Sequence, residues 1–119
     1  MYAIKEDAKK INGVELQTFC REVQNARTEI EVEAGTTGFK GGCCRDKGAR
    51  AFLAIDCNQG DFFFDPKRDE NGRVVGIAIA CCGDDALASL IDTLGFAMKA
   101  IIDQCDETDA YERRKRTDY

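Results

Sequence analysis

The residues best suited to chemistry lie in one glycine-rich segment, residues 35–50, which reads GTTGFKGGCCRDKGAR. It holds five glycines and four cationic side chains, although the whole chain is acidic. Glycines allow successive backbone N–H groups to face one anion, and Lys40, Arg45 or Arg50 can supply the counter-charge. The spacing matches neither a G-x-G-x-x-G motif nor a P-loop. The segment therefore predicts an anion-binding loop, with a plain solvated surface loop as the alternative.

Histidine is absent from the chain, whereas cysteine is frequent. The seven cysteines include two adjacent pairs, Cys43-Cys44 and Cys81-Cys82, and no C-x-x-C spacing. Without histidine the chain lacks the commonest general base and the commonest metal ligand. We expect reduced thiols, no catalytic residue, no metal site and no cofactor; metal binding and redox sensing by the cysteines are the less favoured alternatives.

Catalysis by carboxylates is the rival hypothesis. Several aspartates could hold Mg²⁺ for phosphoryl chemistry on nucleotides. They also follow strands or begin a helix, which explains them more simply. These candidates are Asp56, Asp61, Asp65, Asp84 and Asp85.

Length and charge limit the class of protein. A chain of 119 residues with 44% hydrophobic residues is expected to form a single ligand-binding domain, residues 1–119, of which about 106–119 is a charged tail. The formal charge of −5 argues against binding duplex nucleic acid. No apolar run approaches the length of a membrane span and no leader peptide is recognisable, so we expect a cytoplasmic protein with no membrane partner.

The segment before the glycine loop is expected to contain a helix and a strand. Residues 1–12 predict a short helix or arm that ends at the Asn12-Gly13 turn. From Val14 to about Asn25, apolar residues recur at helical spacing, which predicts a short amphipathic helix. Its arginines, Arg21 and Arg27, fit the end of such a helix, and a ligand or subunit contact is the alternative. Residues 28–34 alternate strictly between apolar and acidic, as in a half-buried strand.

After the glycine loop we expect three more strands and one long helix. The strands are predicted at residues 50–57, 62–64 and 74–81, with a hairpin turn at Asn71-Gly72, and the helix begins at Asp84. The fold class is therefore α+β: a four-stranded antiparallel meander covered by one long C-terminal helix, with a short N-terminal amphipathic helix.

The long helix carries an apolar stripe that we expect to cover the sheet. Phe96 falls outside this stripe, which indicates an outward-facing ring and self-association through the helix, with a merely exposed ring as the alternative. The final segment is acidic and then basic, as in a solvated tail; Arg113 and its neighbours could instead fold over a bound phosphate or onto another protomer. The stripe consists of Leu87, Leu90, Ile91, Leu94, Met98, Ile101, Ile102 and Cys105.

Together these features favour binding over reaction. Backbone N–H groups and arginine suit a phosphate, while Phe39 or a ring of residues 62–64 could stack on a base. A nucleotide is the ligand class that this combination indicates. A protein-interaction module without a small ligand is the third hypothesis.

The order of acidic strand, Gly35-Thr36-Thr37-Gly38-Phe39-Lys40-Gly41-Gly42, Gly48-x-Arg50, meander and long helix resembles the small phage-encoded Thoeris anti-defence proteins of the first type. The resemblance implies a homo-oligomer, a dimer or hexamer, that acts as a sponge in the host bacterial cell. It would bind cyclic ADP-ribose isomers, and also cyclic oligonucleotides, without cleaving them. The vicinal cysteines depart from such a loop. The matching positions imply ligand contacts from Thr36, Thr37, Phe39, Lys40 and Arg50.

Overall fold

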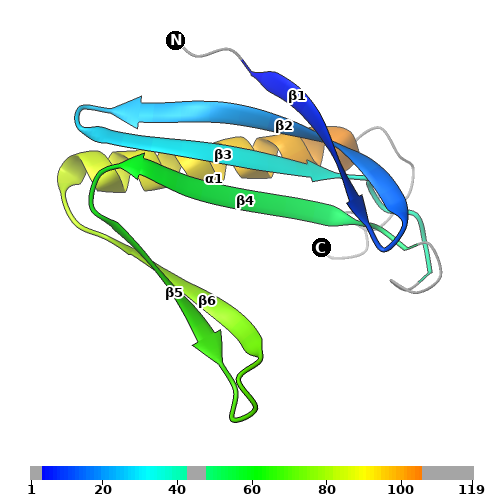
Figure 1. Ribbon diagram of the computed structural model, residues 1–119. Coiled ribbons are helices and arrows are strands. Elements are labelled where there is room, and N and C mark those ends of the chain that lie inside the picture. Colours follow the sequence, from blue (N-terminus) through cyan, green and yellow to red (C-terminus); the bar gives the residue numbers. More distant parts are fainter. Residues whose placement is uncertain (1–3, 43–47, 106–119) are drawn as a thin grey trace, which may run out of the picture.

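The computed structural model describes residues 4–42 and 48–105 and confirms an α+β fold (Figure 1). Four antiparallel strands form sheet A in the order β1-β2-β3-β4, and two further strands form a separate hairpin, β5–β6. One helix, α1, lies across sheet A. The bounds are β1 Lys5–Ile11, β2 Val14–Asn25, β3 Thr28–Thr36, β4 Ala51–Gln59, β5 Phe62–Arg68, β6 Val74–Cys81 and α1 Asp84–Cys105.

The expected N-terminal helix is wrong, because residues 14–25 form the long strand β2. Asn12 and Gly13 both have positive φ, at 48° and 80°, as a two-residue hairpin turn requires, so Ile11 pairs with Val14 and residues 5–11 become strand β1. A second turn at Ala26, whose φ is 52°, returns the chain into β3. The two turns force an extended path, and the helical spacing of apolar residues in β2 is coincidental.

The expected meander is correct only in its first half. Residues 28–34 and 50–57 correspond to β3 and β4, which are joined by the glycine loop as anticipated. The two later strands leave the sheet and pair only with each other, although their turn at Asn71-Gly72 is where the sequence placed it. β1 and β2 supply the other half of sheet A instead.

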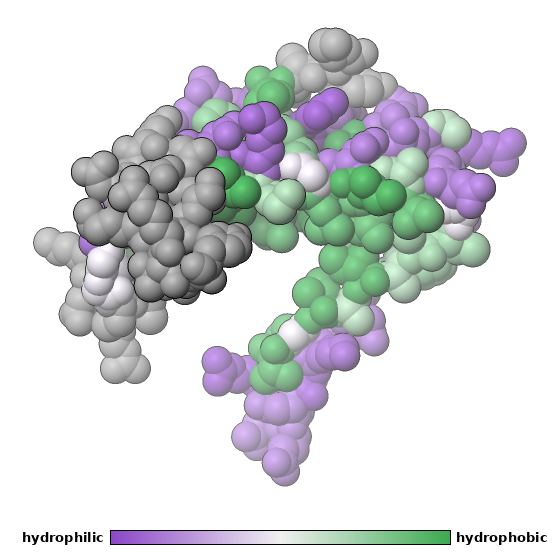
Figure 2. Space-filling view, turned by 180° about the vertical axis from the view of Figure 1, so that it is seen from behind, coloured by the Kyte–Doolittle hydropathy of each residue, from purple (hydrophilic) through white to green (hydrophobic). Residues whose placement is uncertain are grey.

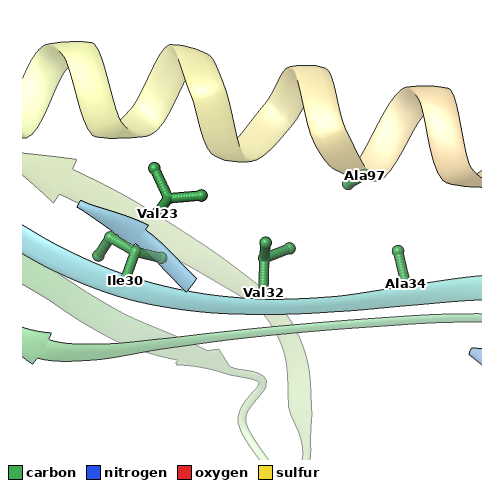
Figure 3. Packing of buried hydrophobic residues seen from close by; sticks show 5 residues of the cluster. All are labelled: Val23, Ile30, Val32, Ala34 and Ala97. Carbon is green, nitrogen blue, oxygen red and sulfur yellow. The ribbon is translucent and has the colours of Figure 1, made fainter. Parts of the chain in front are cut away.

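The core lies between β3 and α1 (Figure 3). Ile30 and Val32 are fully buried and point from β3 toward the helix, where Ala97 meets them. Small helix residues allow the helix to lie close over these branched side chains. The helix residues buried against the sheet are accordingly small, namely Ala86, Ser89, Thr93 and Ala97, with Cys105 near the end.

The prediction that the large apolar stripe of α1 covers the sheet is therefore wrong for half of its members, whereas Ile101 packs against the core cluster and Cys105 is buried. Leu87, Ile91, Leu94 and Met98 are between 51% and 62% exposed. At about 100° per residue they lie roughly 110° around the helix from the small residues that face the sheet. Phe96, expected to point outward, is instead partly buried and packs against the core cluster.

The start of α1 is tied to the turn between β2 and β3. The Thr28 hydroxyl donates to Asp85 Oδ2 at 2.9 Å, and Asp85 Oδ1 accepts from the Ala86 N–H at 2.9 Å. Further along, Asn25 Nδ2 donates to Ser89 Oγ at 2.9 Å and to Asp92 Oδ2 at 3.2 Å. These bonds fix the helix over β2 and β3; on the same side of β4, Ile55 and Cys57 pack against the core cluster and Leu53 is left exposed.

Candidate functional site

A groove of about 950 Å³ lies where α1 runs alongside β2. Sheet A is wider than one helix, so its β1 side extends beyond α1 and the angle between them stays open. Phe19, Arg21 and Val23 line it from β2. The helix contributes mainly Asp92, Gly95, Phe96, Lys99, Ala100, Asp103 and Gln104. Its volume is that of a small-molecule binding site.

Arg21 is the distinctive group of the groove. Its guanidinium lies over the Phe96 ring, with 5.9 Å between Cζ and the ring centroid. Its Nε–H is buried and has no hydrogen-bond partner in the part of the chain that the structure describes. An unpaired buried N–H costs free energy, and a guanidinium is matched to carboxylate and phosphate oxygens. Arg21 is thus prepared to accept an oxyanion beside an aromatic ring.

The charged side chains that α1 presents to the groove already have polar partners. Lys99 Nζ pairs with Asp103 Oδ2 at 3.0 Å, and Asp92 accepts the hydrogen bond from Asn25. Both carboxylates face the same groove as Arg21 and would repel a second anionic group placed near them. The groove therefore suits a ligand whose anionic part is confined to the Arg21 end.

In the glycine loop, three residues predicted to contact a ligand instead form hydrogen bonds to the protein itself. Thr36 Oγ1 donates to the Arg50 carbonyl at 2.7 Å, and Thr37 Oγ1 accepts the Arg50 N–H at 3.0 Å. The Arg50 guanidinium is buried, donating to the carbonyls of Ile11 at 3.2 Å and Gly48 at 2.6 Å. Thr36, Thr37 and Arg50, three of the predicted ligand contacts, therefore hold the adjoining strand ends in place.

The remaining predicted contacts are more open or lie elsewhere. Lys40 is exposed and Phe39 is half-buried. Arg45 and Arg113 lie outside the described residues, so the structure places neither. Gly35 serves a different purpose from anion binding: a Cβ there would lie 2.2 Å from the Gln17 carbonyl oxygen, so only glycine permits this approach of β3 to β2.

Gln104 connects the glycine loop to the groove. Its Oε1 accepts the Thr36 N–H at 3.0 Å, and its Nε2 donates to the Gln17 carbonyl at 3.0 Å. Gln104 also lines the groove and so links that groove to the base of the loop. A ligand extending from Arg21 along α1 would reach the loop that the sequence singled out.

A group with metal-ligand chemistry occurs on the opposite face of sheet A. Ligand atoms of Asp7, Cys20 and Glu33 lie within 4.8 Å of one another. Lys9 occupies the same place, with Nζ 3.2 Å from Asp7 and 3.1 Å from Glu33. Hydrogen bonds to Glu33 and Asp7 raise the pKa of Lys9, and burial raises the pKa of the Cys20 thiol. The group is an ion-paired cluster with a protonated thiol, which disfavours metal binding.

The aspartates proposed for Mg²⁺ are not brought together. Within residues 4–42 and 48–105, the Asp7 cluster is the one set of three metal-capable side chains in mutual reach. Asp85 is engaged by Thr28, whose hydrogen bond lowers the pKa of its carboxyl. The structure thus offers the carboxylate–Mg²⁺ hypothesis no assembled site among these residues.

Sequence reasoning missed the groove because it depends on two incorrect assignments. Arg21 was placed at a helix end and Phe96 on an outward face, so their meeting could not be anticipated. The usable signal was Asn12-Gly13 between two polar–apolar segments, which indicates a hairpin and hence a strand at Arg21.

None of the described helical residues forms a segment long and apolar enough to traverse a bilayer. Comparison with family models, curated proteins and solved structures found no match to this chain.

Proposed function

We propose that this protein binds a cyclic nucleotide signal without cleaving it, and so removes the signal from its receptor. The observation that carries the proposal is the buried, unpaired Nε–H of Arg21 beside the Phe96 ring in a groove of ligand size. A phosphate oxygen would satisfy the guanidinium, and a base or ribose would lie along α1 against Phe96 and Ala100.

The resemblance of the glycine segment to the Thoeris anti-defence proteins supplies the ligand class. A cyclic ADP-ribose isomer, or a cyclic oligonucleotide, would place its phosphates at Arg21 and extend its uncharged part toward the base of the loop near Gln104. Sequestration of such a molecule in a bacterial host would block an anti-phage defence. A homo-oligomer, dimer or hexamer, is part of this proposal.

The direct test is to incubate the protein with a cyclic ADP-ribose isomer, denature it with heat and identify the released molecule. Intact ligand is the expected result, and a cleaved product would contradict the proposal. At about 100 times its Kd, the ligand is expected to stabilise the fold by about 2.7 kcal/mol in a thermal-shift measurement.

Arg21→Ala tests the groove. Losing one hydrogen bond to a charged group is expected to weaken binding about 10- to 100-fold by calorimetry. Phe96→Leu keeps an apolar side chain but loses the ring, with an expected loss of about tenfold. Arg27→Ala is the matched control, because Arg27 is an exposed arginine in the turn that follows β2.

Lys40→Ala separates the groove from the loop. A modest loss with Lys40→Ala and a large loss with Arg21→Ala would agree with a ligand anchored in the groove. If binding depended on Lys40 and was indifferent to Arg21, the groove would be the wrong site.

A further inference from the structure

The hairpin β5–β6 projects away from the rest of the molecule (Figure 1), and it carries an apolar face. The pairs Phe62–Cys81, Phe64–Ile79 and Pro66–Ile77 lie directly opposite each other and therefore share that face. Phe62 and Phe64 stack with 6.3 Å between ring centroids. The opposite face is small or polar, apart from Phe63 and, near the tip, Val74.

Among the residues that the structure describes, only the base of this hairpin is held by the rest of the chain. Phe62 packs against the core cluster, whereas Ile77 is 61% and Val75 60% exposed. A two-stranded hairpin with an uncovered apolar face is at most marginally stable in water. The extended position of β5–β6 therefore requires a partner surface.

A complementary apolar surface lies on the same chain. It comprises the stripe of α1 formed by Leu87, Ile91, Leu94 and Met98, together with Leu53 on the helix side of β4, which is 52% exposed. Figure 2 shows apolar surface running from the body of the molecule onto the upper half of the hairpin, while the hairpin tip is hydrophilic. This corner lies on the side of α1 away from the Arg21 groove, and Ile91 is the stripe residue that also borders that groove.

We infer that the hairpin of a second copy fills this corner, and that the two copies exchange hairpins about a two-fold axis. Two-fold symmetry buries both apolar surfaces of each copy at once, because each chain donates a hairpin and receives one. The lengths agree: the apolar face of β6 extends about 20 Å and the α1 stripe about 16 Å.

The exposed area suits a stable dimer. Eight side chains, four from the hairpin and four from α1, expose roughly 100 Å² each, so each copy offers about 800 Å², the contribution of one partner to a standard interface. Residues 106–119 of the same chain are a poor alternative to a second copy as the partner of this apolar surface, since they read DETDAYERRKRTDY and are mostly charged. The hairpin side chains are Phe64, Val75, Ile77 and Ile79.

Complementation between two variants tests this arrangement. Ile77→Lys damages the hairpin and Leu94→Asp damages the helix stripe. Each variant alone is expected to be monomeric by analytical ultracentrifugation, whereas the unchanged protein sediments as a dimer or a multiple of it. In the mixture, one contact is unaltered and the other joins Lys to Asp, so a heterodimer is expected to form.

Phe63→Lys is the matched control, because Phe63 is 60% exposed on the other face of the same hairpin. The assembly formed by this variant should have the same mass in solution as that of the unchanged protein. Circular dichroism verifies that each variant is folded. The inference is overturned if the unchanged protein sediments as a monomer at a protein concentration of tens of micromolar. It is equally overturned if Ile77→Lys still associates, or if the mixture stays monomeric. Because mass is measured without nucleotide, the outcome is independent of the proposed ligand.

Discussion

The sheet-facing side and the outward side of α1 differ in the size of their residues. Toward sheet A the helix presents Ala86, Ser89, Thr93 and Ala97, and outward it presents leucine, isoleucine and methionine. The sheet already supplies large branched residues from β3, so the helix must supply small ones. The comparison teaches that the most hydrophobic face of a helix need not be the face that its own chain buries.

The largest effect is expected when a residue on the sheet-facing side of α1 is replaced by a larger one. Ala97→Leu adds a side chain above Val32 and Ala34, where the structure leaves no room, and should destabilise the protein by about 3 kcal/mol. Urea denaturation at fixed protein concentration measures this effect.

The neighbouring residue provides the control for that substitution. Met98→Leu changes an exposed residue on the outward face and should alter stability by no more than about 0.5 kcal/mol. Equal effects of the two substitutions would show that the two faces are not distinguished by packing.

A smaller effect of opposite sign is expected at Thr93. Its hydroxyl is buried without a hydrogen-bond partner in the described residues, so Thr93→Val should stabilise the protein by about 1 kcal/mol. Ser89→Ala on the same face removes a real bond, that from Asn25, and should destabilise by a similar amount. A loss of stability with Thr93→Val would mean that its hydroxyl is satisfied.

The smallest effect concerns the first turn of α1 and depends on pH. The Thr28 hydrogen bond holds the pKa of Asp85 below its ordinary value of 3.8. The unfolded state therefore binds this proton first, so the contribution is complete above about pH 4 and is lost as pH falls through the lowered pKa. Thr28→Val should reduce stability at pH 7, and this loss should shrink as the pH falls below 3.8, as measured by denaturant titration.

Asp85→Asn is the companion variant for this measurement. It removes the titrating group and should flatten the same part of the pH profile. If the profile below pH 4 keeps its slope in Asp85→Asn, another carboxyl is responsible.

The sequence was informative where one pattern had one structural solution. The strict alternation of Ile30, Val32 and Ala34 with glutamates predicted β3, and the long helical period from Asp84 predicted α1. In β2 the spacing of Leu16, Phe19 and Val23 also satisfies a helix, and only the turns at both ends resolve it. The periodicity of apolar residues within one segment carries no information about the turns at its ends.

The candidate site was predictable only in part. The glycine segment was correctly placed between two strands, and Thr36 does border the groove through Gln104. Two features could not be predicted: the burial of the Arg50 guanidinium and the contact between Arg21 and Phe96. Both depend on how the strands pair and where the helix lies, and the local sequence around each residue does not specify either. Which face of α1 meets the sheet is likewise decided by the residue sizes on β3.

The strand β1 has a consequence for how copies of this protein can meet. It forms one edge of sheet A, and unpaired strand edges invite further strands to add and propagate into fibres. Its sequence, KEDAKKI, crowds that edge with charges of both signs, three of them lysines, which discourages strand addition. At this edge of sheet A, open-ended sheet growth is thereby disfavoured relative to closed contacts made by side chains.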